Sequence, residues 1–276
     1  MKGNGAAKAE SIIEMVQKHD DLMVMNDEAH HVHDDDLEWW KIIEKLHEGL
    51  IERTGKGLVA QLDFSATPKD QNGTFFPWIV SDYPLAQAVE DKIVKCPLVV
   101  HQTDRKDPDK YNNAAVAYQE WIQIALNRWR EHTDAFKKVG VKPVLFVMAQ
   151  NTRDADAIAD SIRREADINE NEVLVIHVSE RGTGKGQISD ADLDKAREAA
   201  RSIDKVGNRI KVVVSVLMLR EGWDVRNVTV ILGLRPFTSD ANILPEQAVG
   251  RGLRLIRDMP LDYAQVVEIV GTPKFE

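Results

Sequence analysis

The sequence predicts an α/β protein in which parallel β-sheets are flanked by helices. Short apolar runs rich in β-branched residues, typical of strands buried on both faces, alternate with amphipathic helical segments. This alternation favours parallel strands, because a parallel connection needs a crossover long enough to hold a helix. The chain of 276 residues is long enough for one large or two medium-sized domains.

Composition is that of an ordinary globular protein. Apolar residues make up 43% of the chain and charged residues 29%, and the one cysteine, Cys96, excludes an internal disulfide framework. No apolar run approaches the roughly 20 residues of a membrane span, and the N-terminus lacks the apolar core of a secretory signal. We therefore expect a cytoplasmic protein that does not enter a membrane. The net charge of −9 does not by itself indicate nucleic-acid binding, although an acidic surface can coexist with a basic groove.

In the first part of the chain, two predicted strands end in polar residues. After an amphipathic helix at residues 9–16, a short strand at residues 22–25 leads into Asn26-Asp27-Glu28-Ala29-His30. A helix at residues 37–51 and a strand at residues 58–64 follow, and the strand leads into Ser65-Ala66-Thr67-Pro68. Ligands of α/β sheets bind at the carboxyl ends of parallel strands. There one acid can hold Mg²⁺ through water while its neighbour activates an attacking water.

A cluster of histidines and aspartates at residues 30–36 permits a second interpretation. Imidazole and carboxylate groups are metal ligands, so the cluster could form the centre of a metal-dependent hydrolase. A solvated loop whose aspartates cap the next helix is the favoured interpretation.

The rest of the chain predicts a second α/β domain after a polar linker at residues 101–113. A long helix at residues 114–139 carries an apolar stripe, which we assign to packing rather than to ligand stacking: Tyr118, Trp121, Ile122, Ala125 and Trp129. The further elements are strands at residues 144–148, 173–178, 212–214, 228–234 and 264–270, with helices at residues 154–166 and 190–204.

Residues 211–254 carry the most informative polar groups of this second domain. The strand at residues 212–214 precedes Glu221-Gly222-Trp223-Asp224, and a later helical segment contains Gln247, Gly250, Arg251 and Arg254. At these spacings one helix would project Gln247, Arg251 and Arg254 from nearby turns of one side. Two arginines held in this way suit an anion that gains charge during a reaction, such as a transferring phosphoryl group.

Together these segments resemble the motifs of superfamily 2 DEAD/DEAH-box helicases. Asp27-Glu28-Ala29-His30 resembles motif II, and Ser65-Ala66-Thr67 resembles motif III. Residues 149–153 correspond to motif IV, residues 215–224 resemble motif V, and residues 247–254 resemble motif VI. The sequence EGWDVRNV, followed by QAVGRGLR, is most similar to the Res subunit of type III restriction–modification enzymes.

This resemblance implies tandem RecA-like domains of the P-loop NTPase fold, with ATP and Mg²⁺ bound between them. Residues 1–100 would be the C-terminal part of the first domain, residues 101–113 the linker and residues 114–276 the second domain. By resemblance, Asp27 would hold Mg²⁺, Glu28 would be the catalytic base, and Arg251 and Arg254, with Gln247, would complete the catalytic set. The implied ATP-binding or coupling residues are Asp27, His30, Ser65, Thr67, Gly222, Asp224 and Gly250, and the implied nucleic-acid-binding residues are Asn151, Thr152 and Ser215.

The phosphate loop of this family, G-x-x-x-x-G-K-[ST], is not found in the sequence. The glycine-containing segments at residues 54–57 and 181–186 do not fit it, because neither has a hydroxyl after the lysine. We therefore expect the chain to be part of a larger ATP-dependent DNA helicase or translocase, completed by an upstream Walker A region and partnered by a modification (methyltransferase) subunit. The alternative is a non-catalytic, truncated helicase-fold protein with weak nucleic-acid binding, so activity of the isolated chain stays open.

Overall fold

A computed structural model describes residues 16, 18–29, 38–66, 68, 74–76, 78–101, 106–108, 110–176, 198–199, 201–216, 224–234, 249–257, 259–260, 263–273 and 275. The chain divides into two units. The first unit comprises residues 1–82 and 239–243, and the second comprises residues 83–238 and 244–276.

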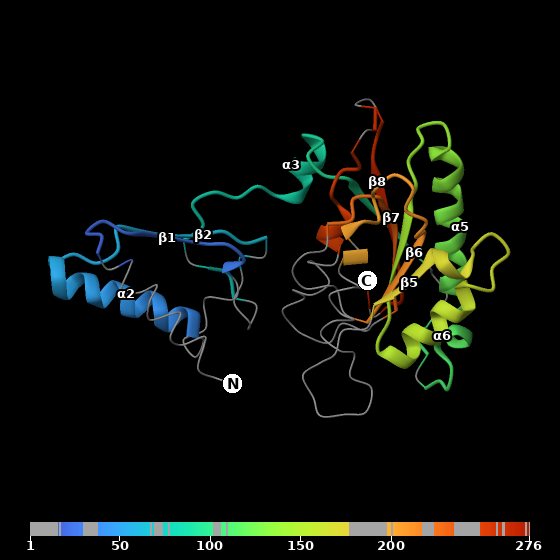
Figure 1. Cartoon of the computed structure of the whole chain (residues 1–276), viewed down its shortest axis with the longest axis horizontal. Coiled ribbons are helices and arrows are strands. Elements are labelled where there is room, and N and C mark those ends of the chain that lie inside the picture. Colours follow the sequence, from blue (N-terminus) through green and yellow to red (C-terminus); the bar gives the residue numbers. More distant parts are fainter. Residues whose placement is uncertain are drawn as a thin grey trace. The chain divides into compact units, whose positions relative to one another are not determined.

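The second unit is built on a six-stranded sheet in which all pairings are parallel (Figure 1). The strand order is β3-β8-β7-β4-β6-β5. The central strands β4, β6 and β7 are buried at every position, as expected for a parallel sheet covered on both faces. The predicted α/β class is therefore confirmed. The strands are β3 (Cys96–Val100), β4 (Val144–Met148), β5 (Val173–Ile176), β6 (Val212–Ser215), β7 (Val228–Gly233) and β8 (Val266–Gly271).

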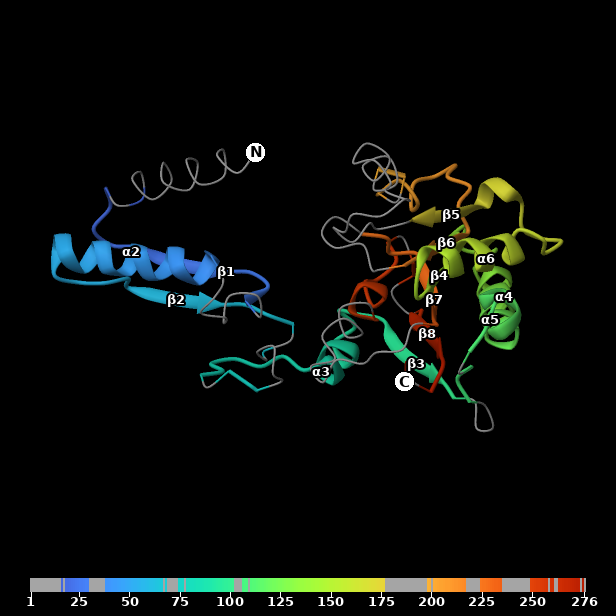
Figure 2. The same ribbon diagram turned by 90° about the horizontal axis from the view of Figure 1, so that it is seen from below.

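One face of this sheet is covered by α4 (Ala114–Ala117), α5 (Gln119–Phe136) and α6 (Thr152–Ile162), which lie on the same side in both ribbon views (Figures 1 and 2). The aromatic stripe predicted to pack is buried in this core: Tyr118, Trp121, Ile122, Ala125 and Trp129 are each at most 4% exposed. The opposite face packs Val144, Phe146 and Met148 of β4 against residues of other segments, among them Ile203, Leu253 and Phe275.

The prediction of one continuous helix over residues 114–139 was wrong, because the helix is interrupted at Tyr118. This residue adopts φ −105° and ψ 16°, which ends α4 before α5 begins. Its ring lies 5.3 Å from that of Tyr111 and 5.9 Å from that of Trp121, in edge-to-face contacts. Asn113 caps α4 by accepting hydrogen bonds from the backbone N–H groups of Ala115 and Val116.

The predicted domain boundary at residue 100 was also wrong. β3 pairs in parallel with β8, from Cys96 opposite Val266 to Val100 opposite Val270. The short helix α3 (Leu85–Glu90) and β3 therefore belong to the second unit. The polar segment at residues 101–113, predicted to join two domains, instead leads from β3 to α4 within the second unit.

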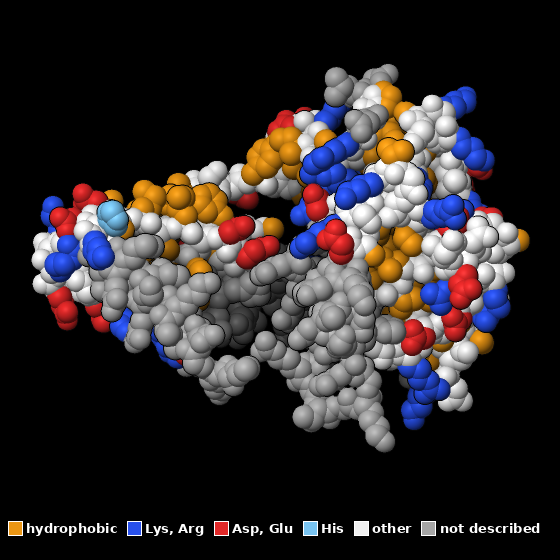
Figure 3. Space-filling model, in the orientation of Figure 1, with side chains coloured by type: hydrophobic (Ala, Val, Ile, Leu, Met, Phe, Trp, Pro, Cys, Tyr) orange, Lys and Arg blue, Asp and Glu red, His pale blue; other side chains and the backbone are white. Residues whose placement is uncertain are grey.

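The first unit contains β1 (Met23–Asn26), α2 (Glu38–Thr54) and β2 (Ala60–Asp63). The two strands pair in parallel, with Asn26 opposite Asp63, and α2 buries Ile43 and Leu50. Four apolar side chains of the paired strands and the residue after them remain 42–68% exposed: Met23, Met25, Leu62 and Phe64. Figure 3 shows hydrophobic side chains gathered over this pair of strands.

Two predicted helices fall mainly outside the described residues, namely those at residues 9–16 and 190–204. The described parts of the chain contain no helix that is both long enough and apolar enough to cross a membrane.

The ring of Phe275 occupies a space left by two glycines at the ends of β7 and β8. Gly233 and Gly271 are paired across these strands. A Cβ atom on Gly233 would lie 2.2 Å from Cδ2 of Phe275, and one on Gly271 would lie 2.6 Å from Cδ1. The absence of side chains at these positions therefore lets Phe275, which is 7% exposed, cover the end of the sheet.

We expect Gly233→Ala to displace this ring and to lower the free energy of unfolding by about 1–3 kcal/mol, as overpacking does in other cores. Urea denaturation followed by tryptophan fluorescence measures the change. Gly250→Ala is the matched control, because a Cβ atom there would meet no atom within 4 Å. Equal destabilisation by the two substitutions would contradict the packing role of Gly233.

Candidate functional site

Two carboxylates follow β1 directly at its C-terminal end. Asp27 and Glu28 are both exposed, and the backbone N–H of Glu28 donates to Oδ1 of Asp27 at 2.9 Å. Glu28 has a φ of 52°, in the left-handed region. For a residue with a Cβ atom, this conformation costs roughly 1–2 kcal/mol of conformational free energy. Such outliers persist where the surrounding structure holds them, and they are frequent at functional sites.

Backbone hydrogen bonds connect this turn to the residues after β2. The N–H of Phe64 donates to the carbonyl of Asn26 at 2.8 Å, and the N–H of Ala29 donates to the carbonyl of Phe64 at 3.0 Å. Ser65 follows Phe64 in the chain, so the structure brings the predicted residues Asp27, Glu28 and Ser65 to one edge of the small sheet. The predicted residues His30 and Thr67 lie outside the described residues.

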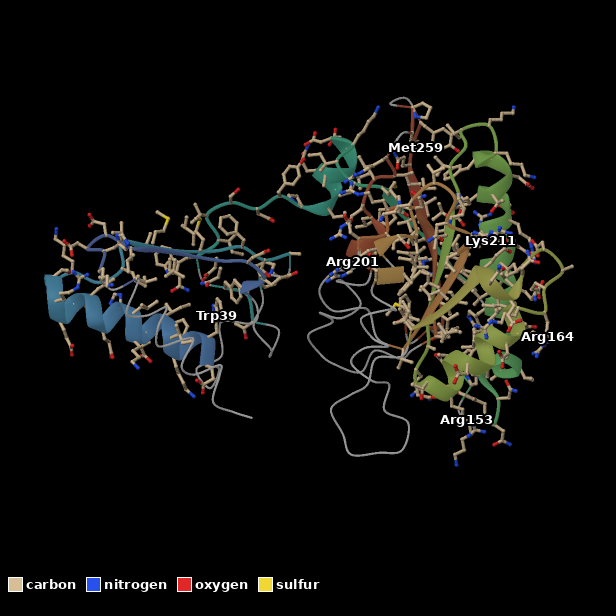
Figure 4. The ribbon with its side chains drawn as sticks, viewed as in Figure 1. Trp39, Arg153, Arg164, Arg201, Lys211 and Met259 are labelled. Atoms are coloured by element: carbon tan, nitrogen blue, oxygen red, sulfur yellow. The ribbon has the colours of Figure 1, made fainter. Side chains whose placement is uncertain are left out.

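Asn26, which the sequence analysis did not select, fixes the end of β1. Its side chain is almost fully buried, and the amide nitrogen donates to Oδ1 of Asp63 at 2.6 Å. The amide oxygen accepts from the indole N–H of Trp39 at 3.1 Å, which ties α2 to the strand (Figure 4). The sequence feature that could have indicated Asn26 is its position as a polar residue at the end of an apolar strand. Its partners Trp39 and Asp63 could not be identified in this way, because they are distant in sequence.

In the second unit, the predicted residues Asp224 and Arg254 form an ion pair. Nη1 of Arg254 donates to Oδ1 of Asp224 at 2.9 Å, and the guanidinium of Arg226 lies 3.7 Å from the other carboxylate oxygen. The Asp224 side chain is 51% exposed, and exposed pairs of this kind add little to stability. The main effect of this ion pair is therefore to orient the guanidinium of Arg254 and the carboxylate of Asp224 at the surface, rather than to stabilise the fold. Gly222 and Gln247 lie outside the described residues.

The prediction that one helix carries both Arg251 and Arg254 was wrong. Residues 249–252 are helical, but Arg254 lies beyond the helix, in an antiparallel bridge with Val94. The backbone N–H of Lys95 donates to the carbonyl of Leu253 at 2.7 Å. This tertiary hydrogen bond takes the place of further helical bonds. Arg251 is half-buried on the helical turn.

Packing of this helical turn favours a glycine at position 252. A Cβ atom on Gly252 would lie 2.6 Å from Cδ1 of Ile231, a buried residue of β7. Around Gly250 no atom lies within 4 Å of such a Cβ. A role for Gly250 in ATP binding or coupling stays a prediction.

A fully buried lysine joins the segments that carry Asp224 and Arg254. Nζ of Lys95 donates to the carbonyls of Arg226 at 2.6 Å, Val228 at 2.5 Å and Gly252 at 3.1 Å. Burial lowers the pKa of Lys95 to about 7, and the negative charge of Asp204 opposes this shift. Three acceptors use all three donors of an ammonium group. Lys95 thus holds residues 226–228 against the helical turn at residues 249–252.

The predicted nucleic-acid-binding residues lie at the carboxyl ends of β4 and β6. Thr152 begins α6, and the backbone N–H groups of a helix N-terminus favour phosphate. The side chain of Asn151 is engaged in capping that helix, since Oδ1 accepts from the N–H of Asp154 at 2.9 Å and Nδ2 donates to Oδ2 of Asp154 at 2.8 Å. Ser215 is only 1% exposed, so a direct contact of its hydroxyl with a ligand would require local movement.

No group of three or more His, Cys, Asp or Glu side chains in the described parts of the chain is placed to hold a metal ion. The histidine and aspartate cluster at residues 30–36 lies outside them. Two adjacent exposed carboxylates suit Mg²⁺, which is commonly bound by one or two carboxylates together with waters and substrate phosphates. Asp27 and Glu28 are therefore of the chemical type that Mg²⁺ takes as ligands.

No protein-family model matches the sequence, and no curated protein matches it either. Among solved structures, the chain is similar to S. cerevisiae Dbp5 bound to RNA and ADP BeF3, with 13% identity and a TM-score of 0.41 over 97% of this chain and 59% of that chain. It is also similar to the ATP-dependent Type ISP restriction-modification enzyme LlaBIII bound to DNA, with 16% identity and a TM-score of 0.48 over 98% of this chain and 19% of that chain.

A further similar structure is the Sulfolobus solfataricus SWI2/SNF2 ATPase core in complex with dsDNA. The identity is 11% and the TM-score 0.32, over 95% of this chain and 66% of that chain. The chain spans less than two thirds of the length of the Dbp5 and LlaBIII chains. At these TM-scores the similarity does not decide a function, which has to be inferred from the residues themselves.

We expect the stability of the protein to rise with pH above about 7 because of Lys95. The unfolded lysine keeps its proton up to its ordinary pKa of 10.5, whereas the folded one loses it near 7. Between these values the unfolded chain binds more protons, so the contribution of this group to the free energy of unfolding increases with pH.

Urea denaturation at a series of pH values between 6 and 10 would measure this slope, with Lys95→Met as the variant that lacks the titrating group. The variant should also be less stable overall, because three buried carbonyls lose their donor. Identical pH slopes for the two proteins would exclude a lowered pKa of Lys95.

Proposed function

We propose that the chain carries part of the machinery of an ATP-dependent nucleic-acid helicase or translocase of superfamily 2, most like the Res subunit of type III restriction–modification enzymes. The observation that carries this proposal is the placement of Asp27 and Glu28 at the carboxyl end of β1, hydrogen-bonded through the backbone to the segment that contains Ser65. The sequence motifs and this placement point to the same chemistry, hydrolysis of a nucleoside triphosphate.

In the proposed reaction the two carboxylates have separate tasks. Asp27 would contribute an oxygen ligand to Mg²⁺, and the ion would supply positive charge that neutralises phosphate charge. Glu28 orients the attacking water and accepts its proton. The left-handed conformation of Glu28 and the bond from its N–H to Asp27 orient the two side chains from consecutive positions, which supports a division of labour between them.

The second unit would supply the positive charge that a transferring phosphoryl group requires. Arg254 is held beside Asp224 by an exposed ion pair, and Arg251 lies on the helical turn just before it. Because the ion pair is exposed, Arg254 can exchange its carboxylate partner for a phosphate at little cost. By sequence resemblance, Arg251 and Arg254 would stabilise charge on the γ-phosphate, and Asp224 would contact the nucleotide.

DNA is the proposed nucleic-acid partner. The start of α6 at Thr152, next to the cap formed by Asn151, supports a phosphate contact at this edge of the sheet. The Res-like assignment adds three proposals that rest on sequence resemblance alone: an upstream Walker A region, a modification subunit as partner and a cytoplasmic location.

DNA-stimulated ATP hydrolysis by the 276-residue chain tests the proposal. Glu28→Gln should lower turnover by about 10²–10⁴-fold, the contribution of a general base, with little change in the apparent affinity for ATP. Glu48→Gln serves as the control, because it removes an exposed carboxylate from α2 in the same unit. A chain with no turnover above that of the Glu28→Gln variant would favour the alternative, a non-catalytic helicase-fold protein.

Arg251→Ala should abolish turnover in an active enzyme, because an arginine that stabilises the transferring phosphoryl group contributes about 10³–10⁵-fold. Its thermal midpoint should stay close to that of the unmodified chain. Steady-state ATPase assays and thermal unfolding of the same preparations separate the two effects. Near-normal turnover of the Arg251→Ala enzyme would reject this role for the arginine.

A further inference from the structure

A cavity of about 820 Å³ opens in the second unit at the edge of the sheet where β4, β6 and β7 begin. Three segments contribute most of its lining: residues 139–142 before β4, residues 204–208 before β6 and residues 224–227 before β7. Arg201 and Arg257 complete it. The cavity is therefore at the opposite edge of the sheet from Asn151 and Ser215, which follow β4 and end β6.

Basic side chains dominate this cavity. The described part of its lining includes five cationic residues and two carboxylates, a net charge of +3 for these residues in a chain whose net charge is −9. The cationic residues are Lys142, Arg201, Lys205, Arg226 and Arg257, and the acidic ones are Asp204 and Asp224. Figure 3 shows Lys and Arg side chains gathered on this part of the unit, where Figure 4 labels Arg201.

The two carboxylates are already engaged by other groups. Asp204 accepts from the backbone N–H groups of Arg226 at 2.6 Å and Asn227 at 3.2 Å. Asp224 is paired with Arg254, and its distance to Arg226 is 3.7 Å. The hydrogen-bonding capacity of both acids is thus partly used by these groups, and Asp204 also interacts electrostatically with Lys142.

Two of the cations are available to an incoming anion. Lys205 and Arg257 are exposed, and neither has an ion-pair partner in the part of the chain that the structure describes. Arg201 has a single contact of 3.9 Å to Glu198, with both side chains more than half exposed. Lys142 has a different task, since its ammonium donates to the carbonyls of Ile203 and Asn208 and so fixes one wall of the cavity.

We infer that this cavity binds a phosphate-rich anion, either the backbone of a nucleic acid or a free polyphosphate. Its volume lies within the range of about 300–1,000 Å³ typical of ligand sites. None of the described residues that line it is aromatic, so what these residues offer is contact with phosphates, which is independent of sequence, rather than stacking with bases. Clustered Lys and Arg side chains bind such groups through charge-assisted hydrogen bonds.

This inference goes beyond the proposed ATPase. It needs neither Asp27 and Glu28 nor turnover of ATP. Asp224 lines the cavity and also belongs to the proposed ATPase, but Lys205 and Arg257, two exposed cations of the cavity, have no role in the proposed reaction. A binding experiment without nucleotide hydrolysis therefore tests it separately, and failure of the ATPase assay would leave it standing.

The experiment compares the full chain with the double variant Lys205→Gln/Arg257→Gln. Calorimetric titration with inorganic tripolyphosphate and fluorescence anisotropy with a labelled oligo(dT), both at low salt, supply the two arms. The control Lys106→Gln/Arg164→Gln removes the same charge from exposed positions of the second unit that do not line the cavity. Figure 4 shows Arg164 on the opposite side of the unit from Arg201.

We expect the Lys205/Arg257 variant to bind at least one of these anions about tenfold more weakly, and the control to bind within about twofold of the unmodified chain. If oligo(dT) binding weakens, its logarithmic salt dependence should become shallower by about 1–2, and the ligand is a nucleic-acid backbone. If only tripolyphosphate binding weakens, the ligand is a free polyphosphate. Absence of binding to both anions, or equal losses in the two double variants, would overturn the inference.

Discussion

The arrangement of the second unit's candidate site depends on one buried ammonium group. Removing the charge of Lys95 from water costs several kcal/mol, and three hydrogen bonds to the carbonyls of Arg226, Val228 and Gly252 offset part of that cost. These carbonyls belong to two separate segments, residues 226–228 and the helical turn at residues 249–252, and Lys95 fixes the position of one relative to the other. The exposed Asp224–Arg254 pair can therefore be well positioned although an exposed ion pair contributes little to stability.

Apart from β3, the strands could be predicted from the sequence, but their order could not. Residues 144–148 and 212–215 are buried at every position because both faces of the sheet are covered. Their apolar, valine-rich sequences are typical of such strands, which is why they could be predicted. β3 has a similar apolar composition, and nothing local in it specifies that its partner is β8, near the other end of the chain. Periodicity reports burial rather than the identity of the neighbour, which is why the domain boundary was misplaced.

The same distinction applies to the candidate sites. Asp27, Glu28 and Ser65 could be predicted because they follow their strands directly, and parallel pairing brings such ends together. The roles of Lys95 and Asn26 could not be predicted. A buried polar side chain needs hydrogen-bond partners, and the partners of these two residues are distant in sequence. Arg254 was predicted to lie on a helix because of its spacing from Arg251. Residues 249–252 are indeed helical, but the helix ends before Arg254, where the carbonyl of Leu253 accepts a tertiary hydrogen bond from Lys95.

The two candidate clusters also differ in how firmly they are held. The arginines rest on a six-stranded sheet with cores on both faces, whereas the carboxylates rest on two strands whose apolar residues Met25 and Phe64 are more than half exposed. The strain of roughly 1–2 kcal/mol at Glu28 is opposed in part by the backbone bonds that join Ala29 and Asn26 to Phe64. Among the described residues, the carboxylate turn therefore rests on the smaller sheet of the two. Any ligand that bridges Asp27 and Glu28 would contribute to holding it in the conformation seen here.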